Sequence, residues 1–149
     1  MFIRFVLVFV FAAISCQGAE NVTASNLLGI GRKQSVAVSG KLICEGKPAS
    51  NIKLKLYENE ILMDRLMEEG HTDSNGQFKL SGTKREISTI DPKLNIYHKC
   101  NYHGLCYRKF TIKIPKDYVN SGSEAKRTYD IGTLNLANRY PDESTDCIN

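Results

Sequence analysis

Apolar and polar residues alternate over short runs along most of this chain. Ile52, Leu54 and Leu56 alternate with polar or amphipathic neighbours, which predicts a half-buried strand over residues 52–57. Other β-rich segments are separated by turn residues and cover residues 36–44, 61–67, 78–80, 94–98, 110–114 and 129–136. The segment 61–67 has helix-forming residues, but it is short and soon reaches a turn signal, so we interpret it as a strand. About seven short strands without a long helix predict an all-β fold, a β-sandwich.

The N-terminus has a different pattern. Arg4 precedes an uninterrupted apolar run over residues 5–14, and small residues follow it. At roughly ten residues the run is too short for a membrane span, which needs about 20. It therefore predicts a secretory signal peptide over residues 1–18, with cleavage before Ala19 favoured and cleavage after Ser15 as the alternative. We expect a secreted, extracellular protein.

The mature chain then has an N-terminal extension over residues 19–35 and one domain over residues 36–149, because roughly 130 residues leave no room for a second domain. The extension carries the only N-glycosylation sequon of the chain, at Asn21, which we predict as a candidate glycan acceptor. Removal of Arg4 with the leader changes the formal net charge from +4 to +3. The basic pairs are scattered, so the pattern does not indicate nucleic-acid binding. Solvated strand faces are the favoured interpretation, and a patch for anionic lipid or glycan is the alternative.

The cysteine count is consistent with secretion. Cleavage removes Cys16 from the five cysteines and leaves Cys44, Cys100, Cys106 and Cys147. Four cysteines in an oxidising compartment predict two disulfides, with three possible connectivities. The short segment between Cys100 and Cys106 favours a bond between those two residues, which leaves Cys44 to pair with Cys147. A bond that closes a loop of about 100 residues contributes on the order of 4 kcal/mol in the chain-entropy model.

The same region also has metal-ligating residue types. His98, Cys100, His103 and Cys106 lie within nine positions, a spacing that is compatible with a zinc site of two thiolates and two imidazoles. In a secreted protein the thiols are expected to be oxidised, so the disulfide is the favoured interpretation. We therefore predict no metal and no other cofactor.

Short motifs are spaced in order along most of the domain. They are GKPA (46–49), TDSNGQF (72–78), DP (91–92), IYHKC (96–100), IPKDY (114–118), YDIGTLNL (129–136) and DCI (146–148). Together they resemble the nematode transthyretin-like family, over about Gly40 to Cys147. The resemblance implies a secreted transthyretin-like or immunoglobulin-like β-sandwich of about seven strands. Most members of that family have no assigned activity. Some are described as bridging lipid exposed on dying cells to an engulfment receptor, or as secreted by parasites into hosts.

The chain departs from two relatives of that family. Transthyretin uses its C-terminal strands for dimer contacts and a hormone channel, whereas only about a dozen residues follow Leu136 here, so we expect no such channel. The related hydroxyisourate hydrolases use a histidine on the first strand and a Tyr-Arg-Gly-Ser C-terminus. Ser39 stands at the position of that histidine, and the chain ends DCIN. Without a base at that position, proton transfer has no obvious agent.

These observations favour a non-enzymatic extracellular interaction module, an adaptor or signalling ligand that contacts a cell-surface receptor or membrane lipid. The alternative is a carrier of a small apolar ligand, and a hydrolase related to the hydroxyisourate hydrolases is less favoured. The first hypothesis predicts salt-sensitive binding of the oxidised protein to cells or anionic liposomes. The second predicts that a lipid-sized or hormone-sized mass co-purifies with the protein.

Overall fold

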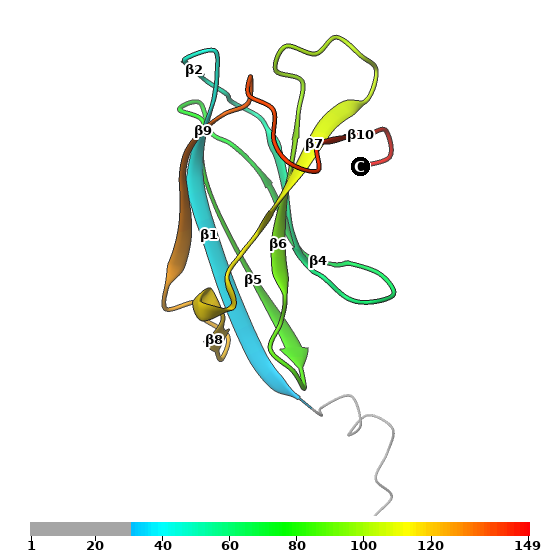
Figure 1. Cartoon of the computed structure of the whole chain (residues 1–149). Coiled ribbons are helices and arrows are strands. Elements are labelled where there is room, and N and C mark those ends of the chain that lie inside the picture. Colours follow the sequence, from blue (N-terminus) through cyan, green and yellow to red (C-terminus); the bar gives the residue numbers. More distant parts are fainter. Residues whose placement is uncertain (1–30) are drawn as a thin grey trace, which may run out of the picture.

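The computed structural model describes residues 31–149, which form two β-sheets packed face to face (Figure 1). The predicted signal peptide over residues 1–18 and the sequon at Asn21 lie outside the described residues. Within the described part, no helix has both the length and the apolar character needed to cross a membrane. The predicted all-β sandwich is confirmed.

The first sheet is built around one long strand. It contains β1 (Arg32–Cys44), β2 (Lys47–Pro48), β5 (Gln77–Glu86), β8 (Asn120–Ser121) and β9 (Thr128–Asn135). One edge of β1 pairs in antiparallel fashion with β5 and, toward the end of β1, with β2, and the other edge pairs with β8 and β9. The pairing of β1 with β9 is parallel and is interrupted by a bulge.

The second sheet is antiparallel throughout and has the order β10-β7-β6-β3-β4. Its strands are β3 (Lys53–Glu58), β4 (Arg65–His71), β6 (Pro92–His98), β7 (Tyr107–Lys113) and β10 (Ser144–Asp146). A short 3-10 helix, η1 (Lys116–Tyr118), precedes β8. Since β3 and β6 pair from one end to the other, the β3–β4 loop lies where β6 begins and the β6–β7 loop lies where β6 ends.

The hydrophobic core lies between the two sheets. In β3, Leu54 and Leu56 are fully buried while the residues between them are partly exposed, so the alternation read from the sequence is confirmed. The other large, fully buried side chains of the core include Val36, Val38, Leu42, Ile90, Leu94, Ile96, Phe110 and Leu136. Each such burial contributes roughly 1.5–3 kcal/mol relative to exposure.

Several strands have other bounds than the sequence predicts, and two of these differences concern β1 and β4. β1 begins at Arg32 rather than at residue 36, so the end of the expected extension belongs to the sheet. The strand expected over residues 61–67 begins only at Arg65 and runs on to His71. Pairing with β3 fixes its ends, because the ladder between the two strands runs from Glu58↔Arg65 to Lys53↔His71. Residues 61–64 therefore lie in the connecting loop.

The turn between β4 and β5 was predicted from its residues and is confirmed. The Asp73 carboxylate accepts hydrogen bonds from the backbone N–H of Asn75 and Gln77, at 2.9 and 2.8 Å. Gly76 has φ +73°, and a Cβ added there would lie 2.2 Å from the carbonyl oxygen of Leu42. A glycine is thus required both by the backbone conformation and by the close approach of β1.

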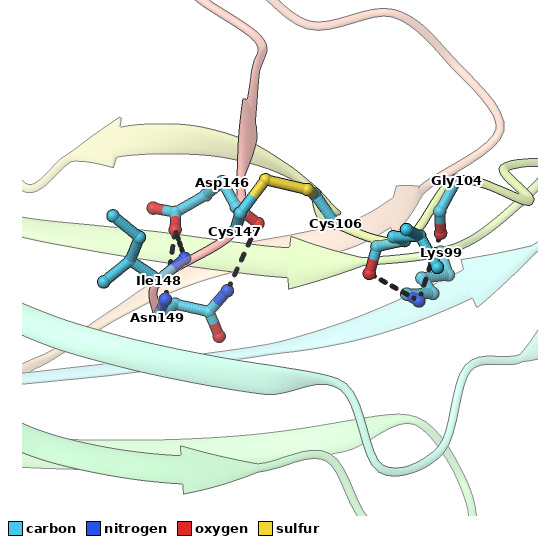
Figure 2. The surroundings of a disulfide bond; sticks show 8 residues. Lys99, Gly104, Cys106, Asp146, Cys147, Ile148 and Asn149 are labelled. Atoms are coloured by element: carbon cyan, nitrogen blue, oxygen red, sulfur yellow. Dashed lines mark hydrogen bonds between the residues drawn. A yellow bond between two sulfur atoms is a disulfide. The ribbon is translucent and has the colours of Figure 1, made fainter.

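The disulfide pairing expected from spacing is wrong. Cys44 bonds Cys100, and Cys106 bonds Cys147, with Cα–Cα distances of 5.8 and 4.4 Å. The physical reason is that the loop after β6 brings Cys100 to the end of β1 in the opposite sheet, whereas Cys106 lies beside β10. The first bond joins the two sheets, and the second holds the C-terminal strand on β7 (Figure 2). No disulfide closes the short loop between Cys100 and Cys106, and both bonds instead join residues that are far apart in the sequence.

Candidate functional site

The loop between β3 and β4 exposes a run of large apolar side chains. Ile61 and Leu62 are fully exposed, and Met63 is 66% exposed. Leu66, at the start of β4, is half exposed. The loop projects from the side of the second sheet (Figure 1). Single exposed apolar residues are ordinary, but several adjacent ones at a loop tip indicate an interaction surface. We call residues 61–63 the apolar tip.

Ion pairs fix the base of this loop. Glu60 accepts a hydrogen bond from Lys84 on β5 at 3.1 Å and pairs with Arg65 at 3.5 Å. Asp64 pairs with Lys93 on β6 at 2.6 Å. The hydrogen bond from Lys84 and the neighbouring cations hold the pKa of Glu60 below its usual value. Exposed pairs add little stability, but these connect the loop to both sheets and so define where the apolar tip points.

A buried carboxylate adds a further anchor at the end of β3. Glu58 is 6% exposed, and its two oxygens accept hydrogen bonds from the backbone N–H of Asp91 at 3.1 and 3.0 Å. Burial raises the pKa of Glu58, and the hydrogen bond from Asp91 partly offsets that effect. The β3–β4 loop therefore starts from a fixed point.

A second surface is a groove of about 670 Å³ on the outer face of the first sheet. The strand register places Ser39 between Lys79 of β5 and Asp130 of β9, with Lys41 in the next row. Ser39 thus lies in a polar groove. The lining is mainly polar and charged.

The groove also contains residue types found in nucleophilic relays. Ser39, His71 and Asp73 all line it. Within residues 31–149, however, no hydrogen bond links these three side chains, and the Asp73 carboxylate is engaged by the backbone of its own turn. A relay requires the nucleophile to be within hydrogen-bond reach of its base. The arrangement supplies polar contacts rather than an activated nucleophile.

A third surface is a pocket of about 500 Å³ at the end of the sandwich that carries both disulfides. It is lined by Asn101, Tyr102, Arg108, Ala137, Arg139, Glu143, Ser144 and Thr145. The Nε of Arg108 donates a hydrogen bond to Glu143. Arg139 is exposed and forms no ion pair with any residue in the part that the structure describes. We call this the arginine pocket.

Beside the arginine pocket lies a buried histidine. His98 is directly opposite Arg108 in the β6–β7 ladder and is 1% exposed. Its ring meets Phe110 edge-on at 5.8 Å between centroids, and neither ring nitrogen has a hydrogen-bond partner in the described part of the chain. Burial, reinforced by the charge of Arg108, lowers the pKa of His98 to about 4. The imidazole is therefore neutral at physiological pH.

The structure separates the residues of the zinc hypothesis. Cys100 and Cys106 are oxidised and bonded to different partners, and His98 is buried in the core whereas His103 is exposed. All four cysteines of the described residues are in disulfides, as predicted. The sequence interpretation assigns residues 61–67 to a strand and therefore does not predict the apolar tip. A signal for the tip is present in the sequence, because three consecutive apolar residues between Glu60 and Asp64 break the alternation expected of a strand.

The fold and the surfaces define a small disulfide-bonded β-sandwich protein with an apolar loop tip, a polar groove and an arginine pocket. The model of the transthyretin-like family matches residues 39–115. Transthyretin-like protein 5 of Caenorhabditis elegans is 49% identical in an alignment of 131 residues, which covers 85% of this chain and 94% of that protein. Transthyretin-like protein 2 of the same nematode is 46% identical in an alignment of 136 residues, which covers 85% of this chain and 91% of that protein. The chain belongs to the transthyretin-like family, as the sequence motifs indicated.

Among solved structures, a 9R-lipoxygenase from Cyanothece matches with a TM-score of 0.40 and 20% identity. The match covers 69% of this chain and 16% of the lipoxygenase. A likeness of this size supports no functional argument.

Proposed function

We propose that this protein is a secreted, non-enzymatic interaction module that contacts membrane lipid at a cell surface through the apolar tip. The observation that carries the proposal is the full exposure of Ile61 and Leu62 beside the largely exposed Met63. Moving one such side chain out of water is favourable by roughly 1.5–3 kcal/mol. The costs of association offset part of that gain, so the tip suits reversible attachment.

The shape of the tip favours lipid over a protein pocket. Its side chains protrude from a loop, and the headgroup boundary of a bilayer can adapt to a protruding apolar group. The acidic residues at the loop base, Glu60 and Asp64, are paired with cations. The loop can therefore approach the headgroups without exposing unpaired negative charge. The net positive charge of the mature chain adds a salt-sensitive attraction to anionic lipid.

Vesicle sedimentation tests this proposal. The oxidised protein is mixed with phosphatidylcholine vesicles with and without an anionic lipid, at low and high salt. We expect binding that is stronger on anionic vesicles, and a loss of at least tenfold in the double variant Ile61→Ser, Leu62→Ser. Leu105→Ser is the matched control, because Leu105 is equally exposed on the β6–β7 loop.

Two results would contradict the lipid assignment. One is equal vesicle binding by the tip variant and the wild type. The other is binding of the wild type to cells but not to vesicles, with the cell binding lost in the tip variant. That second pattern would assign the tip to a protein receptor.

The proposal also includes secretion and modification of the N-terminal extension. Protein secreted from eukaryotic cells should begin at Ala19, and intact-mass measurement checks this. A glycosidase-sensitive mass that disappears in Asn21→Gln would support a glycan on that residue. Secreted protein that retains residues 1–18 would contradict the cleavage.

The two other hypotheses have less support. The pockets described above are lined mainly by polar and charged groups, so no observation favours a carrier of apolar ligands. The polar groove lacks a hydrogen-bonded nucleophile and base in the described residues, which supports the non-enzymatic part of the proposal. Native mass spectrometry of secreted material should find no co-purifying lipid.

A further inference from the structure

The arginine pocket lies at the opposite end of the second sheet from the apolar tip. The β3–β4 loop lies where β6 begins, and the β6–β7 loop lies where β6 ends (Figure 1). The β6–β7 loop supplies part of the pocket lining. We propose that this pocket binds the anionic group of an acidic carbohydrate, a sulfate or carboxylate on a sugar ring. It is a second contact site, separate from the proposed lipid contact.

The charges of the pocket favour an anion. The lining includes two arginines, Arg108 and Arg139, and one glutamate, Glu143, so it has an excess of one positive charge. Arg108 uses its Nε for Glu143, and the described side-chain hydrogen bonds leave its terminal amino groups available. Arg139 has no acidic partner in the described part of the chain. Paired N–H donors on a planar guanidinium suit the oxygens of carboxylate and sulfate.

The other lining groups favour a sugar over a bare ion or an apolar molecule. Thr145, which lies opposite Arg108 in the β7–β10 ladder, contributes a hydroxyl group on the same face as Arg108, and Tyr102 contributes an aromatic ring and a phenol. Hydroxyls can donate to and accept from sugar hydroxyls. A volume of about 500 Å³ exceeds what a single sulfate needs and lies in the range of small-molecule sites. The site is therefore sized for a sugar ring that carries its anionic group toward the arginines.

Covalent links hold the walls of the pocket in place. Cys100, which is bonded to β1, directly precedes the wall residues Asn101 and Tyr102. Cys147 follows the wall segment 143–145 and ties it to the start of β7. In Figure 2 the last residues fold back to Asp146, whose carboxylate accepts hydrogen bonds from the following backbone N–H groups. A preformed pocket loses little entropy when a ligand binds.

The same arrangement explains why the two contacts can coexist. A ligand in the arginine pocket and a bilayer at the apolar tip meet different ends of β6 and need no shared residue. One molecule could thus attach to lipid at one end and to acidic glycan at the other.

Calorimetric titration at low salt tests the proposal with a heparin-derived sulfated disaccharide, a carboxylated disaccharide without sulfate, a neutral disaccharide and inorganic sulfate. We expect the acidic sugars to bind more tightly than sulfate alone, and the neutral sugar not to bind. Arg139→Gln should weaken acidic-sugar binding about tenfold, since it removes one charge-assisted contact. Arg139 is exposed and unpaired with any described residue, so the variant should fold.

Lys126→Gln is the matched control, because it removes the same charge from an exposed residue outside the pocket. Its affinity should stay within twofold of the wild type. The proposal is overturned if no acidic sugar binds, or if both variants lose affinity equally, which indicates diffuse attraction. It is also overturned if Arg139→Gln reduces binding to anionic vesicles while no sugar binds. The tip variant should bind the sugar normally, so failure of the lipid proposal leaves this test intact.

Discussion

Lowering the pH from 7.5 to 4.5 should destabilise this fold, and most of the loss should come from His98. Its pKa is about 4 in the folded protein, against an ordinary value of 6.5 for histidine. The unfolded chain therefore takes up a proton in this window while the folded protein does not, and stability falls as the pH falls through it. From these two values the loss is about 2–3 kcal/mol at pH 4.5.

Other titrating groups act elsewhere or in the opposite direction. Glu143 and Asp146 have lowered pKa values, because hydrogen bonds and a paired cation hold each carboxylate charged against the effect of burial. Their contribution to the stability of the fold is therefore lost only as the pH falls below the ordinary pKa values of these carboxyls. Burial raises the pKa of Glu58, so its protonation stabilises the folded state and offsets part of the loss from His98. Between pH 6.5 and about 5, the change in the free energy of unfolding comes mainly from His98 rather than from the carboxyl groups.

Urea unfolding at several pH values measures this effect. His98→Leu should flatten the profile between pH 7.5 and 4.5, because the substituted side chain does not titrate and fills a similar volume. At pH 7.5 its stability should lie within about 1.5 kcal/mol of the wild type, since the imidazole has no hydrogen-bond partner in the described residues. His71→Gln, a change at an exposed histidine, should keep the slope. Equal slopes in the wild type and His98→Leu would refute the reasoning.

Three further comparisons test the fold. Gly76→Ala should lower the free energy of unfolding by about 3 kcal/mol or more, and Gly46→Ala by about 1 kcal/mol. Both glycines have positive φ, but only at Gly76 would the added Cβ clash with a backbone atom. Urea unfolding of both variants therefore separates the cost of backbone strain from that of the clash. Gln34→Leu should cost about 2–4 kcal/mol, since its buried amide bonds two backbone groups of the β5–β6 loop, and thermal unfolding checks this. Replacing Cys44 and Cys100 together by alanine should cost about 4 kcal/mol in denaturant, and a loss near zero would contradict the pairing.

Both proposed contacts lie on connecting segments of the β-sandwich. The two sheets and two disulfides form a stable frame, and the surfaces that we assign to binding lie on the loops and the C-terminal segment that extend from it. Binding residues commonly lie on connections that a rigid scaffold positions. Family membership does not itself assign a partner, so the tip and pocket experiments carry the functional argument.

The sequence alone determined the fold class and several local features. Alternation in residues 52–57 encoded which side of β3 faces the core, because successive side chains of a strand point to opposite faces. The residues DSNG at 73–76 encoded a turn through an Asp side chain and a glycine with positive φ. The four cysteines among residues 31–149 encoded two disulfides. The strand alternation and the turn depend on neighbours in the sequence, whereas the number of disulfides depends only on the cysteine count.

Only the tertiary structure decided which distant segments meet. Cys44 and Cys100 pair because the end of β1 and the β6–β7 loop converge across the two sheets, and spacing along the chain does not reveal that approach. The apolar residues 61–63 became an exposed tip because the β3–β4 ladder ends before them. Arg139 joined Arg108 in one pocket because the C-terminal segment crosses to β7. The periodicity of apolar residues predicts whether a single position is buried or exposed. Which distant residues contact one another depends on strand pairing and packing over the whole chain.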